Sequence, residues 1–117
     1  MKNILTIILL FALISCEKTI PIEIDNVEPR PVVNGMFENG KSLKVELSNS
    51  ALVGNENDIV NLENIDIELF TNDTFREQLI YQNDGNYYSS NPMQAGNNYR
   101  IEFNALNKDI SASSYLP

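Results

Sequence analysis

The chain has 117 residues, of which 16 are acidic and eight are basic, so its formal net charge is −8 at pH 7. A surface of this sign repels phosphate backbones and anionic lipid headgroups, which argues against nucleic-acid binding and against membrane association through the protein surface itself. Histidine is absent from the sequence, which excludes imidazole acid–base catalysis and a Ser-His-Asp triad, and we expect a non-enzymatic protein that uses no cofactor.

Residues 1–15 predict a bacterial lipoprotein signal peptide. Lys2 supplies a positive start, and the segment from Ile4 to Ile14 is almost wholly apolar. This segment is shorter than the roughly 20 residues that cross a bilayer, but it suits the core of a secretory signal. Leu13-Ile14-Ser15-Cys16 has the small-residue-then-cysteine form of a lipobox, so Cys16, the only cysteine, is predicted to carry a lipid anchor. The alternative is a membrane-anchor helix with an incidental cysteine.

Residues 16–31 are predicted to comprise the lipidated cysteine and an extended acidic tether. This segment contains three of the five prolines, and fully stretched it could reach about 50 Å at ~3.3 Å per residue. Ile20, Ile22 and Ile24 alternate with more polar residues or proline, a pattern that an edge strand also tolerates. Tether and edge strand are both open interpretations of this segment.

From Val32 onward the apolar residues recur with a period of two, which is typical of half-buried antiparallel strands. Three runs are clear: Leu43-Val45-Leu47, Ile65-Ile67-Leu69 and Tyr99-Ile101-Phe103. Weaker strands are expected at Val32–Phe37, Gln78–Gln82, Tyr87–Ser90 and Ile110–Tyr115. Tight turns are indicated by Asn39-Gly40, Asp84-Gly85 and Gly96-Asn97. We therefore predict that residues 32–117 form an all-β, antiparallel, Ig-like β-sandwich of about seven strands.

The longest polar connection runs from Asn49 to Glu63, and we expect it to be a mobile loop. Its candidate site for contact with a partner is the cluster Asn55, Glu56, Asn57 and Asp58. Oxygen ligands of this kind also suit Ca²⁺, but no Gly or Glu falls at the positions that an EF-hand requires, so we assign no metal site. A third interpretation is that these side chains are merely solvated.

One motif imitates a nucleotide-binding loop. Residues 35–42, Gly-Met-Phe-Glu-Asn-Gly-Lys-Ser, fit the pattern G-x-x-x-x-G-K-[ST]. A phosphate-binding loop must lead into a helix whose first amides hold the phosphates. Here Ser42 is followed by a strand pattern, and Glu38 would place a negative charge among the phosphates. The sequence therefore predicts a hairpin turn, with Lys41 on the surface.

Two other chemistries have weak support in the sequence. Tyr81, Tyr87, Tyr88 and Tyr99 could stack on sugars, but successive residues of a strand face opposite ways, so Tyr87 and Tyr88 cannot share one platform. Packing in the core or in a hairpin is favoured for these rings. A carboxylate pair could serve a glycosidase, but the acids fall mostly on the expected solvent faces of strands.

A series of short motifs resembles a Bacteroidetes lipoprotein family labelled domain of unknown function 4249. The motifs are Cys16-Glu17-Lys18, Val32-Val33-Asn34-Gly35, Val45-Glu46-Leu47-Ser48, Asp84-Gly85-Asn86-Tyr87-Tyr88 and Gly96-Asn97-Asn98-Tyr99-Arg100-Ile101. They correspond to turns and core strands of that family and not to a catalytic site. Because its members continue past an Ig-like first domain, the resemblance implies that this chain covers the first domain of a longer protein.

The resemblance also implies a cellular role. The family is often encoded near TonB-dependent outer-membrane receptors, so we expect an outer-membrane lipoprotein, on the periplasmic or the outer side. Its function would be that of a non-enzymatic binding or assembly accessory for such a β-barrel receptor or its cargo. The alternative is a stand-alone carbohydrate- or Ca²⁺-binding β-sandwich module, and a third hypothesis is an acidic-pair hydrolase.

Overall fold

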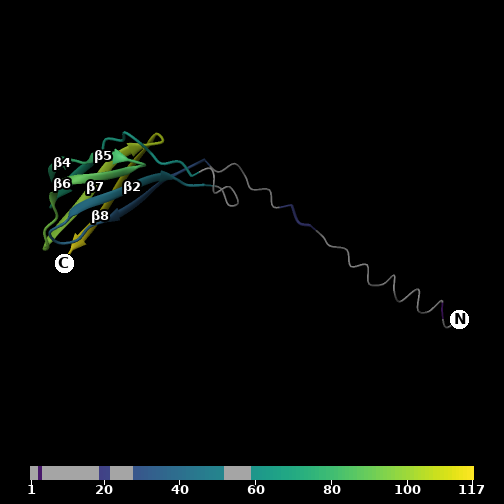
Figure 1. Ribbon diagram of the computed structural model, residues 1–117, viewed down its shortest axis with the longest axis horizontal. Helices are drawn as coiled ribbons and strands as arrows, with labels where there is room; N and C mark the ends of the chain where they lie inside the picture. The colour runs from purple at the N-terminus through teal and green to yellow at the C-terminus, as the bar shows by residue number, and fades with distance from the viewer. Residues whose placement is uncertain (1–2, 4–18, 22–27, 52–58) are drawn as a thin grey trace.

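The computed structural model describes residues 3, 19–21, 28–51 and 59–117, in which the main feature is a sandwich of two β-sheets (Figure 1). The eight strands are β1 (Pro31–Met36), β2 (Ser42–Asn49), β3 (Glu68–Thr71), β4 (Thr74–Gln78), β5 (Ile80–Asn83), β6 (Asn86–Pro92), β7 (Asn97–Ala105) and β8 (Lys108–Leu116). No helix among the described residues is long and apolar enough to span a membrane.

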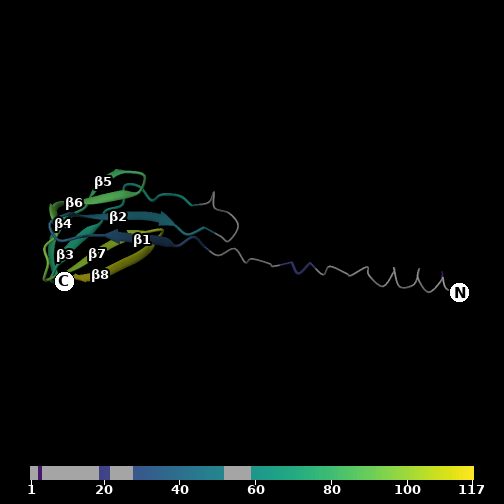
Figure 2. The ribbon, with the colours of Figure 1, turned by 60° about the horizontal axis from the view of Figure 1, so that its bottom comes forward.

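Each sheet has four antiparallel strands, in the orders β1-β2-β6-β5 and β4-β3-β7-β8. Figure 2 shows the two layers facing each other. With β4 set aside and the other seven strands lettered A to G in chain order, β1-β2-β6-β5 is the ABED sheet and β3-β7-β8 is the CFG sheet of an immunoglobulin sandwich. β4 extends the second sheet beside strand C. The predicted all-β, antiparallel, Ig-like fold is confirmed, with eight strands in place of about seven.

The additional strand is β4, which the sequence pattern does not reveal. Its residues show no clean alternation because the pairing with β3 shifts register between Leu69 and Phe70. The chain then changes sheets within one residue: Gln78 ends β4, Leu79 is buried between the sheets, and Ile80 begins β5. The Leu79 amide donates to the Ile67 carbonyl at 2.9 Å, which ties this crossing to the strand beside it.

The core lies between the two sheets and consists of the apolar residues that alternate along the strands. The buried apolar side chains are Leu43, Val45, Leu47, Ile67, Leu69, Leu79, Tyr87, Met93, Tyr99, Ile101, Phe103, Ala105 and Leu116. The three clear runs of the sequence supply most of this set. Ile65 is half-buried and, with Ile67, precedes the ladder of β3, so the alternation begins before the strand does.

The buried ring of Tyr99 has a second role at the start of β7. Its hydroxyl donates to the Gln94 carbonyl at 3.1 Å, and the Gln94 amide donates to the same hydroxyl at 2.8 Å. A tyrosine near the start of strand F that bonds the backbone a few residues upstream is the tyrosine corner of immunoglobulin-like sandwiches. The corner supports the Ig-like assignment independently of the strand order.

Positive φ angles confirm the predicted turns at Asn39-Gly40, Asp84-Gly85 and Gly96-Asn97. Gly40, Gly85 and Gly96 have φ values of 79°, 74° and 83°. Two further turns, Asn72-Asp73 between β3 and β4 and Leu106-Asn107 between β7 and β8, have positive φ at both residues without any glycine. Both central residues of a type I′ hairpin turn have this conformation. The sequence does not indicate these two turns because they contain no glycine, which is the clearest sequence signal for a turn with positive φ.

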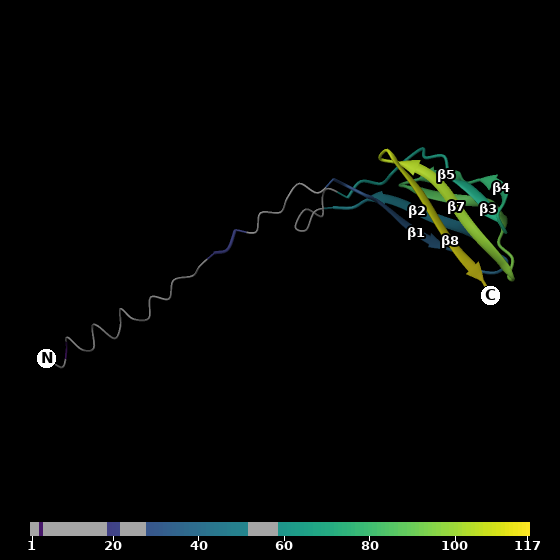
Figure 3. The same cartoon turned by 180° about the vertical axis from the view of Figure 1, so that it is seen from behind.

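The sandwich has two distinct ends. The chain enters at Arg30, whose amide and carbonyl bond Ser50 at 2.9 and 2.7 Å, and Pro31 begins β1 there. We call this the entry end; the β7–β8 hairpin also turns there, whereas β8 finishes at the opposite end (Figures 1 and 3). The first and last strands therefore bring the chain in at one end of the sandwich and out at the other.

Candidate functional site

The residues that the sequence singles out for lipidation and partner contact, Cys16 and Asn55, Glu56, Asn57 and Asp58, lie outside the described residues. The structure does describe both flanks of the Asn49–Glu63 connection. The Asn49 amide donates to the Val60 carbonyl at 2.9 Å, and the Leu62 amide donates to the Leu47 carbonyl at 3.0 Å. These bonds fix the flanks against sheet β1-β2-β6-β5 at the entry end.

Residues 35–42, which match the nucleotide-binding loop pattern, form the turn of the β1–β2 hairpin, as predicted. Gly35 lies in β1, and Ser42 begins β2 where a phosphate-binding loop would begin a helix. Lys41 is exposed and forms an ion pair with Glu38 at 2.6 Å. The Gly40 amide donates to the Met93 carbonyl at 2.8 Å, so this turn packs against the β6–β7 connection.

Three of the four tyrosines considered for sugar stacking pack in or against the core, as the favoured interpretation has it. Tyr88 is half-buried and lies on the opposite face of β6 from Tyr87. The Tyr87 ring is fully buried; its hydroxyl donates to the Leu62 carbonyl at 2.7 Å and accepts from the Ile65 amide at 3.1 Å. Burial raises the pKa of this phenol, and Glu63 adds to the rise. The Tyr81 ring packs against Tyr87 with centroids 5.2 Å apart. Tyr87 thereby pins the connection between β2 and β3 to the sandwich.

In the described structure, β8 forms a long edge whose residues from Ser111 to Tyr115 are all exposed. This nine-residue strand pairs with β7 on one side and ends its sheet on the other. Asn98 of β7 directs both its amide and its carbonyl toward Asn72, on the side away from β8. Asn98 and Tyr115, which lie opposite each other, therefore form a pair without hydrogen bonds between β7 and β8. Because such pairs alternate with hydrogen-bonded ones along an antiparallel ladder, Ser113 and Ser111 also form no hydrogen bonds with β7. The backbone groups of these three residues point outward from the sheet edge.

An apolar groove runs beside this edge, between the first and last strands. We call it the β1–β8 groove; it has a volume of about 190 Å³. Its lining residues are Val33, Gly35, Phe37, Leu43, Val45, Tyr99, Ile101, Ala112, Ser113 and Ser114. Ala112 pairs with buried Ile101 and Ser114 with buried Tyr99, yet both are exposed. Small side chains on β8 and a glycine on β1 leave the core accessible from this side.

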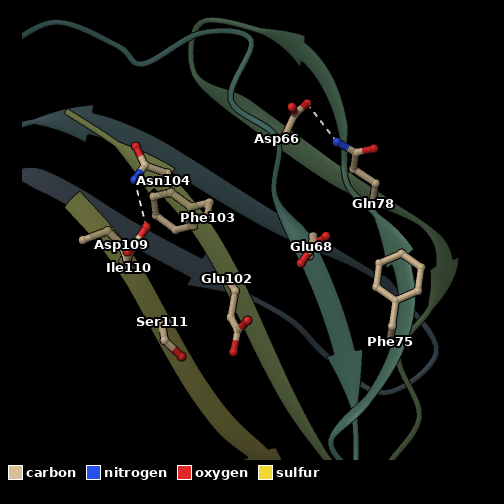
Figure 4. A pocket seen from close by; sticks show the side chains of 10 residues that line it. All are labelled: Asp66, Glu68, Phe75, Gln78, Glu102, Phe103, Asn104, Asp109, Ile110 and Ser111. Atoms are coloured by element: carbon tan, nitrogen blue, oxygen red, sulfur yellow. Dashed lines mark hydrogen bonds between the residues drawn. The ribbon is translucent and has the colours of Figure 1, made fainter. Parts of the chain in front are cut away.

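The outer face of sheet β4-β3-β7-β8 carries a second feature, which we call the acidic hollow (Figure 4). Its volume is about 600 Å³, and it is lined by Asp66, Glu68, Phe75, Gln78, Glu102, Phe103, Asn104, Asp109, Ile110 and Ser111. Glu68 of β3 lies directly opposite Glu102 of β7 in the ladder. Like charges placed opposite each other destabilise a sheet, so their juxtaposition favours binding of a positive group.

Local contacts offset part of the negative charge in the acidic hollow. Arg100 Nη1 donates to Glu102 Oε1 at 2.7 Å, and its guanidinium carbon lies 4.3 Å from the centroid of the Phe70 ring. Asp66 accepts from Gln78 Nε2 and Asp109 accepts from Asn104 Nδ2, each at 2.8 Å. In the part of the chain that the structure describes, no three acidic residues are grouped closely enough to hold a metal ion. Three of the four carboxylates that line the hollow therefore already have a hydrogen-bond partner.

The strand pattern of the sequence predicts that the acids lie on solvent faces, but it indicates neither the groove nor the hollow. Both depend on which strands become neighbours, which a single sequence does not encode locally. The one local signal is the run Ser111-Ala112-Ser113-Ser114, which is small and uncharged at the centre of an expected strand. Because the side chains on both faces of such a strand are small, they leave the backbone groups at its edge accessible to solvent and to a partner.

Comparisons with known proteins assign the chain to a family without assigning a role. No curated protein and no solved structure matches it. A family model described as "Domain of unknown function (DUF4249)" matches residues 17–117, which include every strand of the sandwich. The motifs that carried the resemblance lie at structural positions, with Gly85 and Gly96 in turns and Tyr87 and Tyr99 in the core. The chain therefore belongs to the family of domain of unknown function 4249.

Proposed function

We propose that the protein is a lipid-anchored binding accessory of the outer membrane that captures an extended segment of a partner protein on the edge of β8. The partner would be an outer-membrane β-barrel receptor of the TonB-dependent kind or the cargo of such a receptor. The observation that carries the proposal is that the β8 edge pairs with no other described strand and has an apolar groove beside it. Together they provide backbone partners and a place for side chains.

Strand addition explains why this combination is suited to protein binding. An added strand gains main-chain hydrogen bonds from the edge, and pockets for alternate side chains give selectivity. The outward amides and carbonyls of Ser111, Ser113 and Tyr115 supply the first element, and the β1–β8 groove supplies the second. The chemistry requires no catalytic group.

The other sheet edges of the described structure have features that discourage strand addition. Natural sheets protect their edges with proline, charge, bulges or short strands. The β1 edge begins with Pro31, the β5 strand is short and its register shifts, and the β4 edge is irregular and contains Arg76 and Glu77. Residues 110–116 of β8 contain no charge and no proline. β8 thus has the longest stretch without charge or proline among the described edge strands, which supports its choice as the binding edge.

The lipid anchor predicted at Cys16 gives the binding edge its location. A short tether between an anchor and a binding module raises the effective concentration of the module near membrane partners, reaching the millimolar range for short flexible linkers. A weak strand-addition contact can then hold an accessory on a receptor in the same membrane. The protein would act by placement, without chemistry of its own.

The test is site-specific photo-cross-linking of the native full-length gene product in its own outer membrane. A photoreactive residue replaces Ser113 at the β8 edge, and a matched control replaces Gln82, which is exposed on β5. We expect the Ser113 probe to cross-link one outer-membrane β-barrel receptor or its cargo, identified by mass spectrometry, and the Gln82 probe to leave it uncaptured. Equal capture by both probes, or capture by neither, would overturn the proposal.

A proline variant tests the role of the backbone. Ser113→Pro removes an outward amide of β8 without removing a bond to β7, because Ser113 pairs with Arg100 at a non-hydrogen-bonded position. We expect partner capture in a pull-down to be lost while the melting temperature changes little. A Ser113→Ala control changes the side chain alone and should retain capture.

A further inference from the structure

We infer that the strand held at β8 carries apolar side chains on one face and basic side chains on the other, a specificity that rests on the proposed function. The apolar side chains enter the β1–β8 groove, and the basic side chains extend over Ser111 toward the acidic hollow. The juxtaposition that carries this inference is that β8 separates an apolar groove on its inner side from a cluster of carboxylates on its outer side.

The preference for apolar side chains on the inner side of the added strand follows from the alternating directions of side chains along a strand. Successive side chains of a strand point to opposite faces, so every second residue of an added strand would face the groove. There it would meet Ala112 and Ser114 on β8, and Val33 and Gly35 on β1. Among the described residues, no atom beyond the chain neighbours of Gly35 lies within 4 Å of the position that its Cβ would occupy. Apolar side chains fit this space, and a charged side chain would lose its hydration over the core.

The outer side is set by the register between β7 and β8. Ser111 pairs with Glu102, and Asn104 pairs with Asp109, so two carboxylates border the edge near the start of β8. Neighbouring strands lie about 4.8 Å apart, which places Glu102 about 10 Å from the backbone of an added strand. Lysine and arginine side chains can span most of this distance across the short Ser111 side chain. Figure 4 shows the Glu102 and Glu68 side chains on the face that this approach would cross.

Charge distinguishes a basic partner from a second copy of the chain. Each copy has a formal net charge of −8, and pairing two β8 edges would bring two acidic hollows onto one continuous sheet. Like charges on neighbouring strands destabilise a sheet, whereas opposite charges stabilise it. Complementarity therefore selects a partner segment with positive side chains, which would also be drawn to this face by the field of the domain.

The specificity is tested with synthetic peptides on the full-length protein held in uncharged detergent micelles. Three peptides of equal length are compared by fluorescence anisotropy: alternating valine and lysine, alternating valine and glutamate, and a block sequence with all valines before all lysines. We expect the first to bind at least tenfold more tightly than the other two. Equal binding of the two lysine peptides would overturn the alternation, because charge alone would then explain the affinity.

Variants of the acidic hollow test the outer side. We expect Glu68→Gln combined with Glu102→Gln to weaken binding of the valine–lysine peptide about three- to fivefold, in the range of one exposed ion pair at Glu102 with a smaller contribution from Glu68, which lies one strand further away. Glu38→Gln combined with Asp84→Asn, an equal change of two charges at turns outside the acidic hollow, should leave it within about twofold. Equal losses in both variants would overturn the assignment to the hollow.

The two proposals fail differently in these experiments. If the Ser113 probe captures a receptor or its cargo but Glu68→Gln with Glu102→Gln leaves that capture unchanged, the specificity is wrong and the proposed function stands. If the Ser113 probe captures neither and no peptide binds, both are wrong. Cross-linking of Ser113 to a second copy, or to residues 19–24 of its own chain, would identify another occupant and overturn both.

Discussion

Gly85 occupies a position that only glycine can fill. Its φ is 74°, and a Cβ built on it would lie 2.4 Å from the Leu47 carbonyl oxygen. The same carbonyl accepts the Leu62 amide at 3.0 Å, and the Gly85 carbonyl accepts the Leu47 amide at 2.9 Å. Two residues later, Tyr87 bonds Leu62 and Ile65 through its hydroxyl. The family motif around Asp84-Gly85 thus joins a turn to the connection that leads into β3.

The Gly85 contact gives a prediction with an internal control. Gly85→Ala should destabilise the protein more than Gly96→Ala, because both glycines have positive φ but no atom lies within 4 Å of a Cβ at Gly96. We expect about 1–2 kcal/mol for Gly96→Ala, the usual cost of left-handed backbone, and a larger loss for Gly85→Ala. Chemical denaturation measures both; equal losses would show that the Leu47 contact relaxes without cost.

Tyr87 predicts a loss of stability in alkali. Burial raises the pKa of its phenol above the ordinary 10.0, with Glu63 adding to the rise and the Ile65 amide bond opposing it. The stability from the buried neutral phenol is complete below the unfolded pKa and is lost as pH rises through the higher folded pKa. We expect the free energy of unfolding to fall with pH above about pH 10.

The matched variant for this effect is Tyr87→Phe. It should be less stable than the wild type by about 1–3 kcal/mol at neutral pH, because the Leu62 carbonyl and Ile65 amide lose their partner. Its alkaline slope should be shallower than that of the wild type. Tyr81, whose pKa is also raised, chiefly by desolvation, retains part of the slope. Identical slopes in urea titrations across this range would contradict the assignment.

At the scale of strands and turns, the hairpin between β7 and β8 carries backbone strain. Leu106 and Asn107 have φ values of 51° and 58°, a conformation that costs most residues about 1–2 kcal/mol but suits asparagine and glycine. We expect Leu106→Asn combined with Asn107→Gly to stabilise the protein by about 1 kcal/mol. Leu106→Ala keeps the unfavourable backbone and should bring no gain. Thermal unfolding measures both, and a stabilised alanine variant would contradict the argument.

Strands and glycine turns could be predicted from the sequence because their signals are local. Apolar and polar residues alternate cleanly at Leu43–Leu47 and Tyr99–Phe103. The dipeptides Asp84-Gly85 and Gly96-Asn97 indicate turns with positive φ. The fourth strand, β4, could not be predicted because the register shift in its pairing with β3 breaks the alternation of apolar residues. The groove and the hollow could not be predicted for a different reason, because each is formed by strands that are distant in the sequence. Only the folded sheets bring Glu68 opposite Glu102 and place β1 across from β8.

At the scale of the whole molecule, the predicted anchor and the sandwich have separate tasks. A lipoprotein signal predicts that metabolic labelling with a fatty-acid analogue marks the wild-type protein and that residues 1–15 are absent from its mature form. Cys16→Ser should abolish the label and prevent this processing, because the thiol is the attachment atom. Ser15→Ala, which keeps a small residue before the cysteine, should still be labelled. A labelled Cys16→Ser protein would contradict the assignment of the anchor, as would an unlabelled wild type.

The placement of β1 at the entry end has a mechanical consequence. If the anchor predicted at Cys16 holds the chain to a membrane, a pull from that anchor would reach the sandwich at Pro31 and act along β1, whose six residues pair with β2 from Pro31–Asn49 to Met36–Lys44. If the opposing load is held on β8, these pairs bear the force together, in shear, and are not opened one by one. Resistance to forced unfolding is governed by the unfolding rate, and shear raises the barrier that sets this rate. With the proposed anchor and the proposed partner in place, the first strand would carry the tension between the membrane and the segment bound at the last strand.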